Sequence, residues 1–147
     1  MRYAEVTEAN VQHWADLDLK MFPGQSPADC LEDCREALSS RKQAAFLCMN
    51  DGGHPVAFVN VSLRTDYVEG TDGPPVGFLE AIYVESAYRL HGIAKELAAL
   101  AEKWAAKNGC TVMASDTELT NVDSQAFHAH IGYTEVNRIV AFVKKIS

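Results

Sequence analysis

The feature that most constrains the fold is a nearly continuous apolar segment, Val76 to Val84, followed closely by a long amphipathic segment, Gly92 to Lys107. The first is typical of a strand covered on both faces, and Glu80 is its only charge. The second has its apolar residues on one helical stripe and stops at Asn108-Gly109. With a further strand at Thr111 to Ser115, this predicts a βαβ crossover, and ligands of such units collect at the carboxyl ends of the strands.

The rest of the chain predicts further strands and helices of a single domain, residues 1–147, of mixed α/β class. The expected order is β-α-α-β-β-β-α-β-α-β-β, without an internal repeat or linker. Thr7 is the expected N-cap of the first helix. Strands are expected at Arg2 to Val6, Ala44 to Met49, Val56 to Arg64 and Arg138 to Lys145, with Gly132-Tyr133 opening the last β segment; helices are expected at Thr7 to Lys20, from Ser26-Pro27 to about Ser40, and from Asn121 to Ile131.

Charge and cysteine content argue against several classes of function. The 20 acidic and 13 basic residues give a net charge of -7 at pH 7, which argues against a nucleic-acid partner and suits a cationic substrate; acidity that serves only solubility is the simpler interpretation. The apolar runs are too short to span a membrane, and the first residues lack a secretory signal, so we expect a cytoplasmic location. The 4 cysteines include no Cys-x-x-Cys pair, which predicts free structural thiols and no metal site.

A short polar turn joins the apolar strand to the long helix, and its informative core is Arg89-x-x-Gly92-x-Ala94. Gly92 lets the backbone approach a ligand closely, and the free N–H groups at the helix start form an anion site suited to a pyrophosphate. Arg89 would add positive charge to that site. The bare pattern is equally compatible with an ordinary strand-to-helix turn.

This turn, with the strand before it and a later helix that ends at Gly132-Tyr133, resembles the coenzyme A-binding core of GNAT acetyltransferases. Other segments are similar to one branch of that family, the aminoglycoside 6'-N-acetyltransferases: Met21 to Gly24, Asp66 to Gly70, Pro75 to Val84, Ala114 to Asp116, Asn121 to His128 and Val140 to Lys145. The resemblance implies the GNAT fold, a central mixed and mostly antiparallel sheet flanked by helices. It also implies acetyl-CoA as co-substrate, with no metal.

The resemblance further implies roles for individual residues in binding the cofactor. Backbone groups of Ile82, Tyr83 and Val84 would pair with the pantetheine arm as an added strand. The pyrophosphate would be held by Arg89, Leu90, His91, Gly92, Ile93 and Ala94, and the thiol end of the cofactor would be lined by Asn121, Ala126 and His128.

Two carboxylates, Glu80 and Asp116, are the candidate amine-binding and proton-accepting groups. An ammonium cannot attack a thioester, so an enzyme of this kind must bind a cationic amine, remove a proton and hold the free amine against the acetyl carbonyl. Glu80 lies in an apolar strand, where an unpaired charge is costly to bury, so we expect it to have a partner or a ligand. Asp116 directly follows the next strand. The alternatives are a structural hydrogen bond for Glu80 and a turn or helix cap for Asp116.

Three more residues have expected roles that rest on the resemblance. Many GNAT members carry a tyrosine four residues before the Gly-aromatic pair, as general acid for the leaving thiolate; here that position is His128, for which a packing role is an alternative. Phe22 and Tyr67 are candidates for the wall of an aminoglycoside site, and single aromatic residues of this kind are also common in cores. Relatives commonly have tryptophan at the position of Phe22.

Two other functions fit the same residues. The first is a GNAT enzyme that acts on a different amine, such as a polyamine or a protein N-terminus. The second is a non-catalytic module that binds acyl-CoA. Glu80 and Asp116 argue against the non-catalytic module. The resemblance also implies a homodimer, to which the strand expected at Arg138 to Lys145 would contribute.

Overall fold

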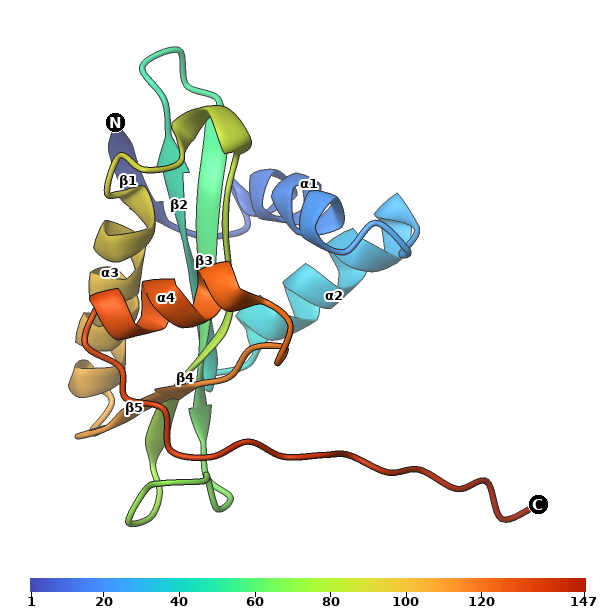
Figure 1. The fold of residues 1–147 in the computed structure, drawn as a ribbon. Coiled ribbons are helices and arrows are strands. Elements are labelled where there is room, and N and C mark those ends of the chain that lie inside the picture. The colour runs from blue at the N-terminus through green and yellow to red at the C-terminus, as the bar shows by residue number, and fades with distance from the viewer.

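The computed structural model describes all 147 residues and is built on one five-stranded sheet (Figure 1). Its strands lie in the order β1-β2-β3-β4-β5, antiparallel except for the parallel pair β4 and β5. This is the expected mixed, mostly antiparallel sheet, and the βαβ crossover through α3 is confirmed. The strands are β1 (Arg2–Glu5), β2 (Gln43–Met49), β3 (Pro55–Arg64), β4 (Val76–Val84) and β5 (Met113–Ser115).

Helices cover the two faces of the sheet unequally. One core cluster joins the first face to α1 (Val11–Met21) and α2 (Pro27–Ser39), and a second joins the opposite face to α3 (Ile93–Lys107). A single 3-10 turn, η1 (Ser86–Tyr88), precedes α3, and α4 (Val122–His130) follows β5. No helix of the chain is long and apolar enough to cross a membrane.

The helix starts reflect capping chemistry. Ser26 caps α2 by accepting the N–H of Asp29, and Pro27 takes the first helical position, as expected. The predicted cap at Thr7 is wrong, because α1 begins only at Val11. Asn10 ties the preceding turn instead, since its side-chain oxygen accepts the N–H of Thr7 at 2.7 Å.

A β-bulge interrupts β4 at Glu80. Asn60 of β3 lies opposite Ala81, but the next residue, Val61, lies opposite Leu79, so Glu80 has no partner on β3. Leu79 and Ile82 both belong with the α3 face, three positions apart instead of two. The bulge therefore turns Glu80 away from regular strand pairing just where the neighbouring strand β5 ends.

The strand expected at Arg138 to Lys145 is not formed. Residues 133–147 have no regular secondary structure, and the last of them extend away from the body of the molecule (Figure 1). The alternation of apolar residues is present, but a strand needs a hydrogen-bonded neighbour, and this segment does not pair with the free edge of β5. We refer to residues 134–147 as the C-terminal tail.

The four cysteines are free and buried, as expected. Cys30 and Cys34 of α2 lie beside Asp18 of α1, and ligand atoms of the three come within 4.8 Å of one another. Burial raises the pKa of Cys30 to about 11 and raises that of Cys34 further. The thiols are therefore held in the neutral form, which packs as a small apolar group and is a poor metal ligand.

Candidate active site at the fork of β4 and β5

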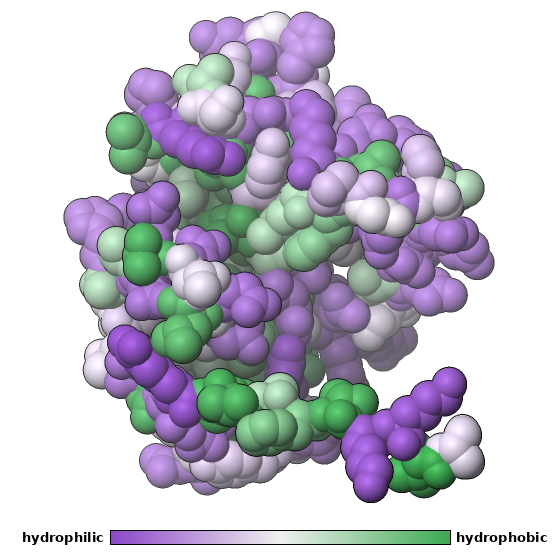
Figure 2. Space-filling model, turned by 45° about the vertical axis from the view of Figure 1, so that its right-hand side comes forward, coloured by the Kyte–Doolittle hydropathy of each residue, from purple (hydrophilic) through white to green (hydrophobic).

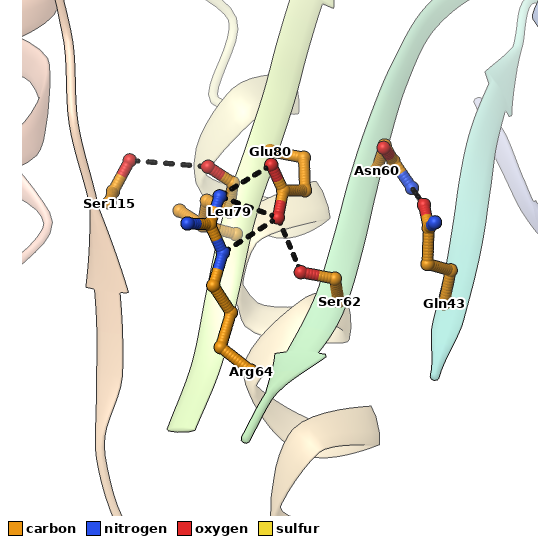
Figure 3. A network of polar contacts seen from close by, with 7 residues as sticks. All are labelled: Gln43, Asn60, Ser62, Arg64, Leu79, Glu80 and Ser115. Atoms are coloured by element: carbon orange, nitrogen blue, oxygen red, sulfur yellow. Dashed lines mark hydrogen bonds and ion pairs between the residues drawn. The ribbon is translucent and has the colours of Figure 1, made fainter. Parts of the chain in front are cut away.

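The face of the sheet that carries α1 and α2 is divided into an apolar and a polar half. On β3, Phe58 packs against Trp14 and Tyr83 under the helices. Further along the same face of β3 the side chains are Asn60, Ser62 and Arg64, which form a polar network with Glu80 and Gln43 (Figure 3). Because the helices stop short of this half, it is free to form the floor of a binding site.

Glu80 has the partner that its place in an apolar strand demanded. Arg64 donates from Nη2 to Oε1 and Oε2, both at 3.0 Å, and from Nε to Oε2 at 3.2 Å. The Ser62 hydroxyl also donates to Oε2, and Ser62 is the only polar residue that is buried. Glu80 is thus a hydrogen-bonded carboxylate in an ion pair, and its side chain is 28% exposed against 42% for that of Arg64.

Asp116 comes to the same place from the other side. Leu79 and Ser115 form the last pair between β4 and β5, and Glu80 and Asp116 are the next residue on each strand. The two acids therefore leave the sheet at one edge, where the parallel strands separate. Asp116 is exposed and makes no hydrogen bond or ion pair within the protein.

Beyond this fork, one side of β4 is unpaired. Only Gly77, Phe78 and Leu79 are paired with β5, so the residues from Ala81 to Val84 are paired on the β3 side alone and Glu80 is paired on neither side. Ile82, Tyr83 and Val84 lie in this stretch, and the Arg89 guanidinium binds the Val84 carbonyl at 2.9 Å. An extended ligand with amide groups fits such an edge, as an added strand would.

The turn before α3 presents a run of unpaired N–H groups. Leu90 has φ 65° and Gly92 has φ 79°, both left-handed, and Gly92 is the N-cap of the helix. The N–H groups of Leu90, His91 and Gly92 have no acceptor in the protein, and those of Ile93 and Ala94 are free because the helix starts there. Residues 89–92 are exposed. This donor set matches a pyrophosphate.

His128 of α4 faces the fork through Ser115. Its Nδ1 lies 2.7 Å from the Ser124 carbonyl and its Nε2 lies 2.7 Å from the Ser115 hydroxyl. A carbonyl only accepts, so Nδ1 carries a hydrogen, and Nε2 of the neutral ring accepts from Ser115. The Tyr133 ring stands edge-on to the imidazole at 5.7 Å and fixes it further.

The other candidate residues surround the fork at a greater distance. Asn121 caps α4, where its side-chain oxygen accepts the Ser124 N–H, and Ala126 is an exposed residue of the same helix. Phe22, directly after α1, is 46% exposed, and Tyr67, in the loop between β3 and β4, is 72% exposed. Neither aromatic ring is a core residue, which removes the alternative considered for both.

A cavity of about 710 Å³ beside the fork does not contain the whole set. It lies between β5, α4 and the first residues of the C-terminal tail, and includes Ser115, Asp116 and His128 but neither Glu80 nor the turn before α3. The cavity lies along the free edge of β5, where another strand could pair, because the C-terminal tail diverges from the sheet there (Figure 1). The fork and this cavity meet at Asp116.

Sequence reasoning missed three residues of the site: Ser62, Arg64 and Ser115. A signal for Arg64 was present, because an unexplained acid in an apolar strand calls for a base on a neighbouring strand. Nothing in the pattern selects Ser62 or Ser115, since each is a small polar residue of a kind that is common in strands.

Comparison with known proteins identifies the class. The chain belongs to the acetyltransferase (GNAT) family, whose model matches residues 11–133. A relative from Serratia marcescens named aminoglycoside N(6')-acetyltransferase type 1 is 40% identical over 137 residues, which cover 93% of this chain and 94% of the relative. A relative of the same name from Salmonella enteritidis is 36% identical over 145 residues and covers 99% of both chains.

Solved structures agree with this grouping. The structure of AAC(6')-Iy in complex with the bisubstrate analog CoA-S-monomethyl-acetylneamine has a TM-score of 0.93 and 35% identity, over 98% of this chain and 97% of that one. The apo aminoglycoside 6'-N-acetyltransferase AAC(6')-IG from Acinetobacter haemolyticus has a TM-score of 0.91 and 37% identity over 100% of both chains. The GNAT fold is therefore shown.

Proposed function

We propose that this protein transfers the acetyl group of acetyl-CoA to the 6'-amine of aminoglycoside antibiotics and so confers resistance to them. The observation that carries the proposal is the fork itself, where Glu80 and Asp116 leave adjacent strands beside an unpaired strand edge. Relatives at 32–40% identity that bear the name of this activity support the choice of substrate.

Acetyl-CoA binding is assigned to the edge of β4 and the turn before α3. Backbone groups of Ile82, Tyr83 and Val84 pair with the pantetheine amides, and the N–H groups of the turn, from Arg89 to Ala94, hold the pyrophosphate. In this arrangement the thioester lies at the fork, with Asn121, Ala126 and His128 of the α4 region at the thiol end. The two structures of AAC(6')-Iy with coenzyme A or its bisubstrate analog support the fit.

The acids act on the amine. Glu80 and Asp116 bind the ammonium, and one of them removes a proton directly or through water. The amine lone pair then forms the C–N bond to the acetyl carbon, while the N–H groups on the unpaired side of β4 stabilise the oxyanion. The C–S bond breaks with its electron pair on sulfur, and the nitrogen loses its second proton to water.

His128 supplies the proton for the departing thiolate through Ser115. The imidazole first takes a proton from solvent, so that Nε2–H donates to the Ser115 hydroxyl. The thiolate then takes the hydroxyl proton and the hydroxyl regains one from Nε2, which returns the ring to the neutral form described above. Phe22 and Tyr67 stack on sugar rings of the substrate, for which their exposure suits them. The net charge of -7 attracts the polycationic antibiotic.

Product mapping tests the function. Purified protein with acetyl-CoA and a kanamycin-like substrate should give a mono-acetylated product modified at the 6' nitrogen, and an analogue with a 6' hydroxyl should not react. Spermidine and peptide N-termini belong in the same coenzyme A release assay. Acetylation on another ring, faster acetylation of those amines, or cofactor binding without any turnover would each overturn the assignment.

We further propose a homodimer that uses the C-terminal tail. Six apolar side chains of the tail are 62–98% exposed, namely Val136, Ile139, Val140, Phe142, Val143 and Ile146, and Figure 2 shows hydrophobic side chains uncovered along it. The outer edge of β5 is also unpaired. A tail from a second copy beside β5 would bury both. A concentration-independent mass near 16.1 kDa in sedimentation would refute the dimer.

Two general features complete the proposal. Residues 1–147 act as one domain, since both core clusters share a single sheet. The protein works in the cytoplasm, where its four unpaired cysteines remain reduced.

A further inference from the structure

Arg64 occupies one oxygen of Glu80 and leaves the other partly free. Oε2 accepts from Arg64 Nε, Arg64 Nη2 and the Ser62 hydroxyl, whereas Oε1 accepts from Arg64 Nη2 alone (Figure 3). A carboxylate oxygen has two lone-pair directions, so Oε2 is saturated and Oε1 keeps one direction for a further donor.

The guanidinium is held in place from its other side as well. Arg64 is the last residue of β3, and its Cζ lies 3.6 Å from the centroid of the Phe78 ring. The side chain is thus fixed between an aromatic face and a carboxylate, which distinguishes it from the exposed pair Arg35 and Glu8 at 3.5 Å. Such a pairing is a lasting part of the site.

We propose that Arg64 divides the work of the two acids: it fixes Glu80 as an anchor that takes one N–H of the substrate ammonium, and so leaves proton removal to Asp116. This rests on the proposed acetyltransferase function. A proton taken from the ammonium would go to Oε1 and neutralise the carboxylate that Arg64 and Ser62 bind as an anion, so that all four of their hydrogen bonds would weaken. Asp116 has no partner that opposes its protonation.

The reaction balances with these roles. One N–H of the bound ammonium donates to Glu80 Oε1, and a second proton passes from the nitrogen to the Asp116 carboxylate. The neutral amine then attacks the thioester carbon as described above. Glu80 is unchanged throughout, and Arg64 is a positioning residue that acts through it.

The proposal predicts an unusual recovery of activity in a double variant. Asp116→Asn should reduce kcat on the order of a hundredfold, the range for a general base. Arg64→Met alone should cost only a few-fold. In Arg64→Met with Asp116→Asn, the released Glu80 can take the proton, and kcat should exceed that of Asp116→Asn by roughly fivefold or more, a coupling of the size seen between contacting residues.

Matched variants assign the cause. Adding Glu80→Gln to the double variant should abolish the recovery, and Glu80→Gln alone should raise the aminoglycoside KM more than it lowers kcat. Arg35→Met removes an exposed arginine pair elsewhere and should change neither constant. If Arg64→Met does not fold, Arg64→Lys keeps the positive charge but loses the bidentate guanidinium, and it supports the same comparison.

The outcomes separate cleanly. A purely structural arginine predicts that the fold losses in kcat of the two single variants multiply in the double variant. A kcat at or below that value would overturn the role of Arg64. The parent rate on the aminoglycoside tests the proposed function independently. Acetyl-CoA affinity, measured by calorimetry, should be the same in all these variants.

Discussion

The two halves of β4 use the same backbone for opposite purposes. From Gly77 to Leu79 the strand is buried and is paired with β5 as well as β3; from Ala81 to Val84 it is half-buried and paired with β3 alone. The bulge at Glu80 marks the boundary. The binding edge therefore exists because β5 ends at Ser115 and leaves the second half of β4 without a neighbouring strand on that side.

The largest effect should come from the packed half. A Cβ at Gly77 would lie 2.7 Å from the Ala105 Cβ and would overlap the Met113 sulfur. Gly77→Val should therefore destabilise the protein by about 3 kcal/mol, which lowers Tm by roughly 10 °C. Gly24→Val, at an exposed glycine with open space around it, is the control. Equal Tm values for both variants would break the distinction between the halves.

The next largest effect should come from Gly92, in the turn before α3. Asparagine tolerates the φ of 79° at Gly92, and a Cβ there meets no protein atom within 4 Å, so Gly92→Asn should fold normally. Its side chain stands where the pyrophosphate approaches, and the acetyl-CoA Kd should rise about tenfold, or about 1.4 kcal/mol. Gly53→Asn has the same φ in the hairpin between β2 and β3, where a Cβ also meets no protein atom within 4 Å, and should leave the Kd unchanged. An unchanged Kd for Gly92→Asn would refute the phosphate site.

A gain in stability is expected at Leu90. A leucine with φ 65° is strained, and its side chain is fully exposed. Leu90→Asn should stabilise the protein by about 1 kcal/mol, or roughly 4 °C in Tm, with acetyl-CoA affinity within about twofold of the parent. A lower Tm for Leu90→Asn would show that the left-handed Leu90 does not destabilise the folded protein.

The smallest effect concerns Asp18, a half-buried acid of α1 that lies outside both halves of β4. Burial raises the pKa of Asp18 above 3.8, and the thiol of Cys30, which donates to it, only partly offsets this. A raised pKa in the folded state means that this group stabilises the fold below about pH 3.8 and that the contribution is lost as pH rises through the folded pKa. At pH 7 the ionised carboxylate is therefore a cost.

Asp18→Asn should accordingly raise Tm at pH 7 by roughly 2 °C, and the difference from the parent should disappear near pH 4. Asp16→Asn, an exposed acid of the same helix, should change Tm little at either pH. A destabilised Asp18→Asn protein at pH 7 would show that the carboxylate is needed in its charged form.

Periodicity predicted the fold wherever an element depends on its own residues. The strands of the sheet, the crossover through α3 and the start of α2 after Ser26-Pro27 follow from local patterns. The strand expected at Arg138 to Lys145 is absent for the opposite reason, because a strand depends on pairing and this segment does not lie against another strand. The bulge at Glu80 was also invisible, since one extra residue in an apolar run leaves the composition unchanged.

The candidate site was predictable in its charges and not in its pairings. Glu80 stood out as a single acid, and its need for a partner followed from burial, but only the register of β3 against β4 brings Arg64 to it. Likewise His128 was expected near the thiol, while its bond to Ser115 depends on where β5 ends. Contacts between strands far apart in sequence need the sheet to be known.

The bulge has a consequence for how this chain tolerates changes in length. Leu79 and Ile82 both point to the α3 face although they are three positions apart, so the bulge takes up one extra residue. Removing one residue between them would leave a regular strand in which Ile82, Tyr83 and Val84 keep their sides, whereas a deletion elsewhere in β4 would exchange the inward and outward sides of every residue beyond it. The strand should therefore tolerate a lost residue at the bulge better than at any other position, and the cost there is the acid or its placement, not the packing of the residues that follow.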